Sequence, residues 1–182
     1  MKTNHWKIFP YLFVLILSSC TSCDEPDPTV LPAEIQSGKN TFGCYINKEL
    51  FVGGFAGFMS PKPFNAWYSV SSNHVTIIVD GVLNSDFKRG ACVVDLSTTF
   101  VRTNSALQIE NANCYNTNGL YPYYVVKNAG EIYFTKLDTI NKIVSGRFKF
   151  AAKSADWQQN LVDNDSIVIT NGRFDLKLTI NN

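Results

Sequence analysis

Histidine is scarce in this chain: there are two in 182 residues. His5 lies in an N-terminal segment typical of a targeting signal, which leaves His74 for the body of the protein. Multi-histidine metal centres need several imidazole ligands, and Ser-His-Asp or Cys-His systems need a histidine base. His74 shares a strand face with Thr76 and Asp80, which indicates an exposed strand residue. The composition therefore argues against these enzyme classes and predicts no metal site.

An excess of charge is also missing. The chain has 16 Lys and Arg residues against 15 Asp and Glu residues, and no basic run is longer than Lys88-Arg89. Nucleic-acid binding requires a basic stripe, so we expect no nucleic-acid partner. The glycines at Gly53, Gly54 and Gly57 lack the Gly-x-x-x-x-Gly-Lys spacing that cradles phosphates. We therefore expect neither a nucleotide site nor a cofactor.

The N-terminal apolar run is too short to span a membrane as a helix. It extends from Ile8 to Leu17 and is interrupted by Pro10, whereas a transmembrane helix needs roughly 20 apolar residues. Two lysines, Lys2 and Lys7, precede the run. A basic start followed by a short apolar segment is typical of a signal peptide.

The signal ends in a sequence that resembles the lipobox of bacterial lipoproteins. Leu17-Ser18-Ser19-Cys20 gives an aliphatic residue, two small residues and a cysteine. The resemblance implies that residues 1–19 are removed and that the thiol of Cys20 carries a diacylglycerol. The several acyl chains of such proteins exceed the single chain that binds membranes only marginally, so the anchor would be stable. The alternative is an ordinary secretory signal with a chance cysteine.

Residues 20–39 have the composition of a flexible tether. Asp24, Glu25 and Pro26 open a stretch that combines charge with proline and lacks apolar periodicity. Acidic residues soon after a lipidated cysteine resemble the surface-export signal of lipoproteins from Bacteroidota-type bacteria. We therefore predict an outer-membrane location, with the cell surface favoured over the periplasmic face. The alternative is a solvated spacer that contains no export signal.

The body, residues 40–182, alternates apolar and polar residues with the period of half-buried strands. Turn signals such as Asp80-Gly81 and Asn118-Gly119 separate the runs, and no segment has convincing helical periodicity. We predict a single all-β domain, an antiparallel β-sandwich or open β-barrel of about eight to ten strands. The clearest alternating runs are Phe42–Ile46, Val75–Asp80, Cys92–Leu96, Ile132–Phe134, Val144–Phe150 and Phe174–Ile180.

Asn171-Gly172 is the sharpest turn signal in the body. Asn-Gly suits a type I′ turn, so the sequence predicts a hairpin between Ile167–Ile169 and Arg173-Phe174. In the run that follows, alternation places Asp175 on the outward, polar face.

The cysteines leave the disulfide pattern open. With Cys20 acylated, Cys23 lies in the tether, and no second Cys-x-x-Cys completes a zinc site. Four remaining cysteines allow three complete pairings. We expect a disulfide among Cys44, Cys92 and Cys114 as one possibility, and small buried hydrophobic residues as the other.

Aromatic residues offer the most plausible binding surface. Exposed rings stack on sugars or form partner hot spots, although core packing explains them equally well. The acidic residues stand in no recognisable catalytic motif, and Asp163-Asn-Asp165 lacks the glycine and distal glutamate of a calcium loop. The candidate ligand contacts are Trp67, Tyr121, Tyr123, Tyr124 and Trp157.

Three stretches of the body resemble a group of small outer-membrane lipoproteins of Bacteroidota-type bacteria. They are Leu31–Cys44 with its "GKNTFGC", the pair Ile132–Asp138 and Ile143–Phe150, and Ile169–Lys177 with its "ITNGRFDLK". The middle, from Gly53 to Asn128, is similar only loosely. The resemblance implies a β-rich domain on a lipid anchor and no particular activity. Members often have a further cysteine before the last of these stretches, where this chain has Trp157–Asn160.

Together these features predict a lipid-anchored envelope protein that acts as a non-catalytic binding or surface-interaction module. Its partners would be the membrane, through the anchor, and a glycan or an envelope protein. Two alternatives stay open: a structural envelope component without a small ligand, and a carboxylate-dependent hydrolase with two facing acids.

Overall fold

The computed structural model describes residues 29–54, 63–83, 92–99, 101–116, 123–127, 130–155 and 161–181. The predicted signal peptide, the acylation site Cys20 and the first part of the predicted tether lie outside the described residues. Tyr121 and Trp157 also lie outside them. The described part is built from strands alone, as the alternation predicts, and contains no helix that could cross a membrane.

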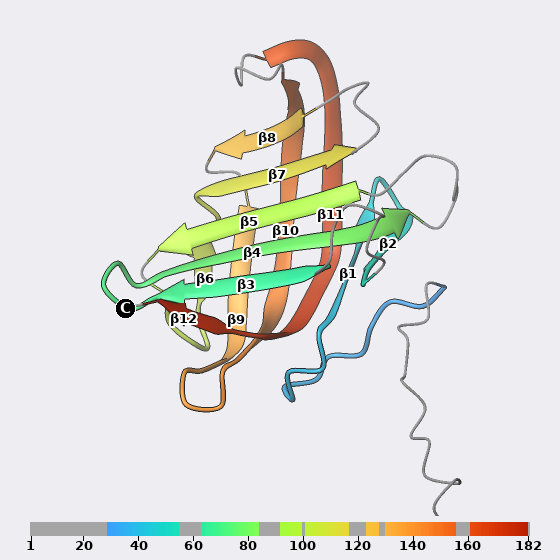
Figure 1. Cartoon of the computed structure of the whole chain (residues 1–182). Helices are drawn as coiled ribbons and strands as arrows, with labels where there is room; N and C mark the ends of the chain where they lie inside the picture. The colour runs from blue at the N-terminus through green and yellow to red at the C-terminus, as the bar shows by residue number, and fades with distance from the viewer. Residues whose placement is uncertain are drawn as a thin grey trace, which may run out of the picture.

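The strands form the two layers of a β-sandwich, and those of one layer cross those of the other (Figure 1). The back sheet has the order β6-β9-β10-β11-β1-β2, and its strands are β1 (Thr41–Ile46), β2 (Glu49–Gly53), β6 (Ala106–Gln108), β9 (Gly130–Asp138), β10 (Ile143–Ala155) and β11 (Leu161–Lys177). The front sheet has the order β3-β4-β5-β7-β8, and its strands are β3 (Phe64–Ser69), β4 (His74–Leu83), β5 (Cys92–Thr99), β7 (Asn111–Asn116) and β8 (Tyr123–Lys127). Short ladders, β2 with β4 and β8 with β10, join the layers at two corners.

The described strands number twelve, more than the sequence predicts. Two of them, β6 and β12 (Thr179–Asn181), have three residues each and lie at sheet edges, β12 parallel to β3. Such short edge strands carry too little alternation to be recognised in a sequence. Strand β3 carries the candidate contact Trp67, and its inward residues Phe64 and Tyr68 pack against the core.

The core between the layers is made by the inward residues of the alternating runs. Phe42, Ile77, Phe134 and Leu176 are all completely buried, as the alternation predicts. A chain of aromatic contacts crosses the core, including stacked rings of Phe42 and Phe148 with centroids 5.0 Å apart. Each such pair adds about 0.5–1.5 kcal/mol beyond the area it buries.

The predicted hairpin at Asn171-Gly172 is wrong, because β11 runs through this dipeptide as one strand of 17 residues. A type I′ turn needs positive φ at both central residues, and in this pair only Asn171 has it, at 51°. The register shifts on both sides of Asn171, so the dipeptide forms a β-bulge. Gly172 is required because a Cβ there would lie 2.6 Å from the ring of Phe148.

Part of the predicted tether is packed on the back sheet. The carboxylate of Asp175 accepts hydrogen bonds from the backbone amides of Ser37, Gly38 and Lys39 at 3.2, 2.9 and 3.0 Å. It also accepts one from the hydroxyl of Ser145 at 2.6 Å. Asp175 points outward as expected but is only 1% exposed, because this coil covers it. The folded body therefore begins earlier than the sequence predicts.

The same coil, drawn in blue before β1 in Figure 1, is held at two further points. The ammonium of Lys136 donates to the carbonyl oxygen of Gln36 at 3.1 Å, and the backbone amide of Lys177 donates to Oδ1 of Asn40 at 2.8 Å. The segment that leads towards the predicted anchor is thus tied to β9 and β11.

Two of the cysteines considered for a disulfide are buried in the core. Cys44 on β1 and Cys114 on β7 are both cysteine thiols, so no disulfide joins these two. Of Cys92 only the backbone, on β5, is described. The alternative that the sequence left open, small buried hydrophobic residues, describes Cys44 and Cys114.

Candidate ligand-binding groove

The structure does not bring the predicted aromatic contacts together. Trp67 lies on β3, at one edge of the front sheet, and Tyr123 and Tyr124 belong to β8, at the other edge. Three strands, β4, β5 and β7, separate them. These residues therefore do not form the single aromatic surface that the sequence suggested.

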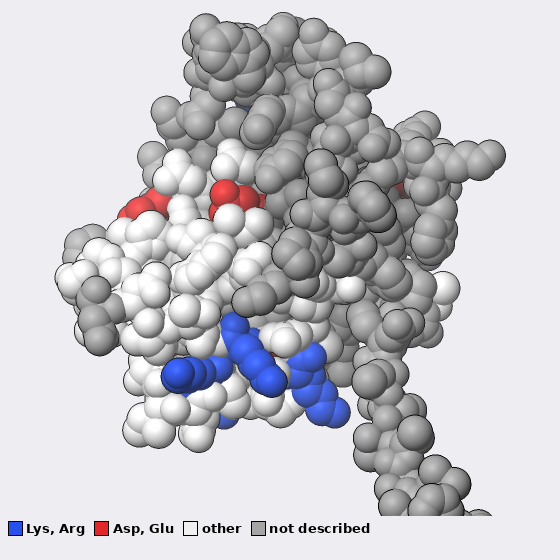
Figure 2. All heavy atoms as spheres, viewed as in Figure 1, with Lys and Arg blue, Asp and Glu red and all other residues white. Residues whose placement is uncertain are grey.

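Trp67 lies on the outer face of the front sheet because its neighbour Ala66 is buried in the core. Figure 2 views this face, where the described acidic groups lie in the upper part and Lys and Arg side chains along the lower rim. His74, on the same face, lies 3.3 Å from the hydroxyl of Thr76. On β5 of the same sheet, burial raises the pKa of Asp95, and a hydrogen bond from Asn113 offsets part of this rise.

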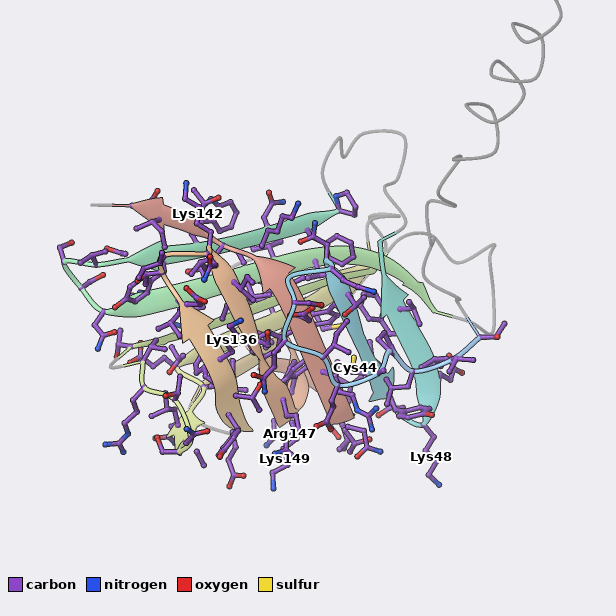
Figure 3. The ribbon with its side chains drawn as sticks, turned by 90° about the horizontal axis from the view of Figure 1, so that it is seen from below. Cys44, Lys48, Lys136, Lys142, Arg147 and Lys149 are labelled. Carbon is purple, nitrogen blue, oxygen red and sulfur yellow. The ribbon has the colours of Figure 1, made fainter. Side chains whose placement is uncertain are left out.

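A groove lies instead on the outer face of the back sheet, across β6, β9, β10 and β11. It consists of two adjoining hollows of about 610 and 380 Å³ that share Ala106, Glu131 and Lys149. Figure 3 shows Arg147 and Lys149 projecting together from the back sheet, away from the front sheet. The groove has no local signature in the sequence, because it depends on the register between strands.

One row of cross-strand partners forms the floor of the smaller hollow. Ala106 of β6 pairs with Tyr133 of β9, Tyr133 pairs with Arg147 of β10, and Arg147 pairs with Arg173 of β11. Two arginines thus stand directly opposite each other on adjacent strands. Like charges in this position destabilise a sheet unless a counter-charge lies beside them.

Each arginine has a contact that orients it. The guanidinium of Arg147 lies over the ring of Tyr133, 5.3 Å from its centroid, within the range of a cation–π interaction. Arg173 donates from Nη1 to the carbonyl oxygen of Pro32 at 3.1 Å. Pro32 in turn sits on Gly43 of β1, where a Cβ would lie 2.5 Å from its Cδ.

A single carboxylate bridges the two guanidinium groups. Oε2 of Glu34 lies 3.9 Å from Nε of Arg147, and Oε1 lies 3.5 Å from Nε of Arg173. Beside this group, Lys149 and Glu131 form an ion pair of 3.1 Å. The described charged residues of the smaller hollow are therefore three cations and two carboxylates. This arrangement can hold an anionic group next to neutral hydrogen-bonding side chains.

Comparisons with protein-family models, with curated protein sequences and with solved structures find no match to this chain. Among the described residues, no three or more His, Cys, Asp or Glu side chains are placed to hold a metal ion.

Proposed function

We propose that this protein is a lipid-anchored, non-catalytic binding module of the cell envelope, and that it holds its ligand in the groove across β6, β9, β10 and β11. The anchor is Cys20, in the outer membrane, with the body displayed at the cell surface. The lipobox-like Leu17-Ser18-Ser19-Cys20 and the acidic residues that follow it support this location. The resemblance to small envelope lipoproteins agrees with it.

The observation that carries the proposal is the cross-strand pair of Arg147 and Arg173 in the floor of a groove. Two opposed arginines cost stability, and the planar guanidinium is well suited to bind carboxylate or phosphate groups. In a purely structural component, the contacts of Arg173 with Pro32 and Glu34 would suffice to hold the coil, without a second arginine opposite. The groove therefore favours binding over that alternative.

The exposure and pairing of the two carboxylates in the smaller hollow argue against the hydrolase alternative. Glycoside hydrolysis uses one carboxyl as a general acid, in an apolar setting that keeps it protonated. Here the side chains of Glu34 and Glu131 are 46% and 59% exposed, and each is paired with a cation. Both are placed as charge partners rather than as an acid and a nucleophile.

Filling the groove should abolish binding. We expect the full chain, solubilised in detergent, to bind at least one member of a panel of immobilised glycans. Ala106→Trp should weaken that binding more than about tenfold, because the indole occupies the space that both hollows share. The control, Ser72→Trp, places the same side chain in the exposed turn between β3 and β4. Binding unchanged by Ala106→Trp, or no glycan bound by the wild-type chain, would contradict the proposal.

A further inference from the structure

We infer that the ligand is a glycan bearing carboxylate groups, and that Glu34 is an internal carboxylate occupying the Arg147–Arg173 site, which the ligand displaces. The inference rests on the proposed function and adds the chemistry of the ligand. The supporting observation is that one carboxylate, that of Glu34, already forms ion pairs with both guanidinium groups.

The guanidinium groups are held in place without Glu34. Arg147 is oriented by the ring of Tyr133 and Arg173 by the carbonyl oxygen of Pro32. A planar guanidinium fixed in this way is suited to carboxylate recognition. The site therefore persists when Glu34 leaves it.

Glu34 is also held weakly. The side chains of Arg147, Glu34 and Arg173 are 53%, 46% and 33% exposed, and the two N–O distances, 3.9 and 3.5 Å, are long. Exposed ion pairs of this kind contribute little to stability. The coil that carries Glu34 is fixed separately by Asp175, so the side chain can swing away while the coil stays bound.

The remainder of the groove favours a sugar over a peptide. Peptides that bind sheets add to a free strand edge, or they use an apolar groove for a helix. This groove lies mainly on the face of β9, β10 and β11, whose backbones already pair with one another, and the edge strand that it reaches, β6, has three residues. Its lining includes the polar side chains of Gln108, Thr170 and Asn171, which suit the hydroxyl groups of a sugar.

Titration calorimetry of the detergent-solubilised full chain with galacturonic acid oligomers tests the inference. Glu34→Gln should tighten binding by about two- to fivefold, because it removes the competing carboxylate. Arg147→Gln and Arg173→Gln should each weaken it by about tenfold, through loss of a charge-assisted contact. Lys142→Gln, an equal loss of charge in the turn between β9 and β10, away from Arg147 and Lys149 in Figure 3, should leave binding within about twofold. Thermal unfolding of each variant reports whether it is folded.

The comparison ligands separate the possible outcomes. Neutral galactose oligomers should bind at least about tenfold more weakly than the acidic ones. Equal binding of sulfated oligomers would overturn the assignment to carboxylate groups, and equal binding of polyglutamate would overturn the assignment to a glycan. Glu34→Gln binding no tighter than the wild-type chain would overturn the role of Glu34. If neutral glycans bind, and Ala106→Trp blocks them while the arginine variants do not, the inference fails and the proposed function stands.

Discussion

Asp175→Ala is expected to lower the free energy of unfolding by about 3–5 kcal/mol, a large effect for a residue on the outward face of a strand. The carboxylate is 1% exposed and receives the amides of residues 37–39 and the hydroxyl of Ser145. Alanine would leave these donors in a covered position without an acceptor. Hydrogen bonds to a charged group contribute about 1.5–3 kcal/mol, more than neutral ones.

Denaturant unfolding of the full chain measures the loss. Glu131→Ala is a suitable control, because it removes a carboxylate that is 59% exposed and paired with Lys149 on the surface. That variant should change the free energy of unfolding by about 1 kcal/mol or less. An Asp175→Ala variant as stable as Glu131→Ala would show that the coil is not fastened by Asp175.

The same contacts give the stability a pH dependence. Burial raises the pKa of Asp175, but the hydrogen bonds from Ser145 and from the amides of residues 37–39 outweigh it, so the pKa lies below its ordinary value. A carboxyl with a lowered pKa in the folded state stabilises the fold fully above the ordinary pKa. This stabilisation is lost as the pH falls through the folded-state pKa. The acid-side loss should be smaller in Asp175→Asn, which has no proton to gain.

Cys20→Ala is expected to move the protein completely out of the membrane fraction. The lipobox-like sequence predicts that all acyl chains are attached at this residue, and several chains give stable binding where one chain is marginal. Labelling of cells with a fatty-acid analogue, followed by fractionation, measures both the lipid and the location. Cys23→Ala, which replaces the other cysteine of this segment, should keep both the lipid label and the membrane location. Lipid labelling that survives in Cys20→Ala would contradict the anchor.

The layers and the core could be predicted from the sequence because alternation is a local property. Phe42, Ile77 and Phe134 were all assigned inward from their neighbours alone, and all are buried. The signal at Asn171-Gly172 was equally local but ambiguous, since an asparagine with positive φ serves a bulge as well as a hairpin. Whether the dipeptide forms a hairpin or a bulge depends on whether β10 pairs with the residues on both sides of it. The dipeptide itself does not encode that pairing.

The groove could not be predicted, because it depends on register. Arg147 and Arg173 are 26 positions apart, and only the ladder between β10 and β11 places them opposite each other. The burial of Asp175 depends in the same way on a coil more than 130 residues earlier in the chain. The composition of that coil predicts a flexible tether, because proline and charged residues are common in it. The coil is instead held in place by hydrogen bonds from its backbone amides, which composition does not report.

The most direct test of the account is to map where a ligand binds. Backbone amide resonances of the full chain in detergent micelles can be followed during titration with galacturonic acid oligomers. If the ligand binds in the groove, the amide resonances of Glu131, Lys149 and Thr170 should shift. Those of Thr76 and Ser97, on the outer face of the front sheet, should change little. Shifts confined to Thr76 and Ser97, beside Trp67, would contradict the placement of the binding site on the back sheet.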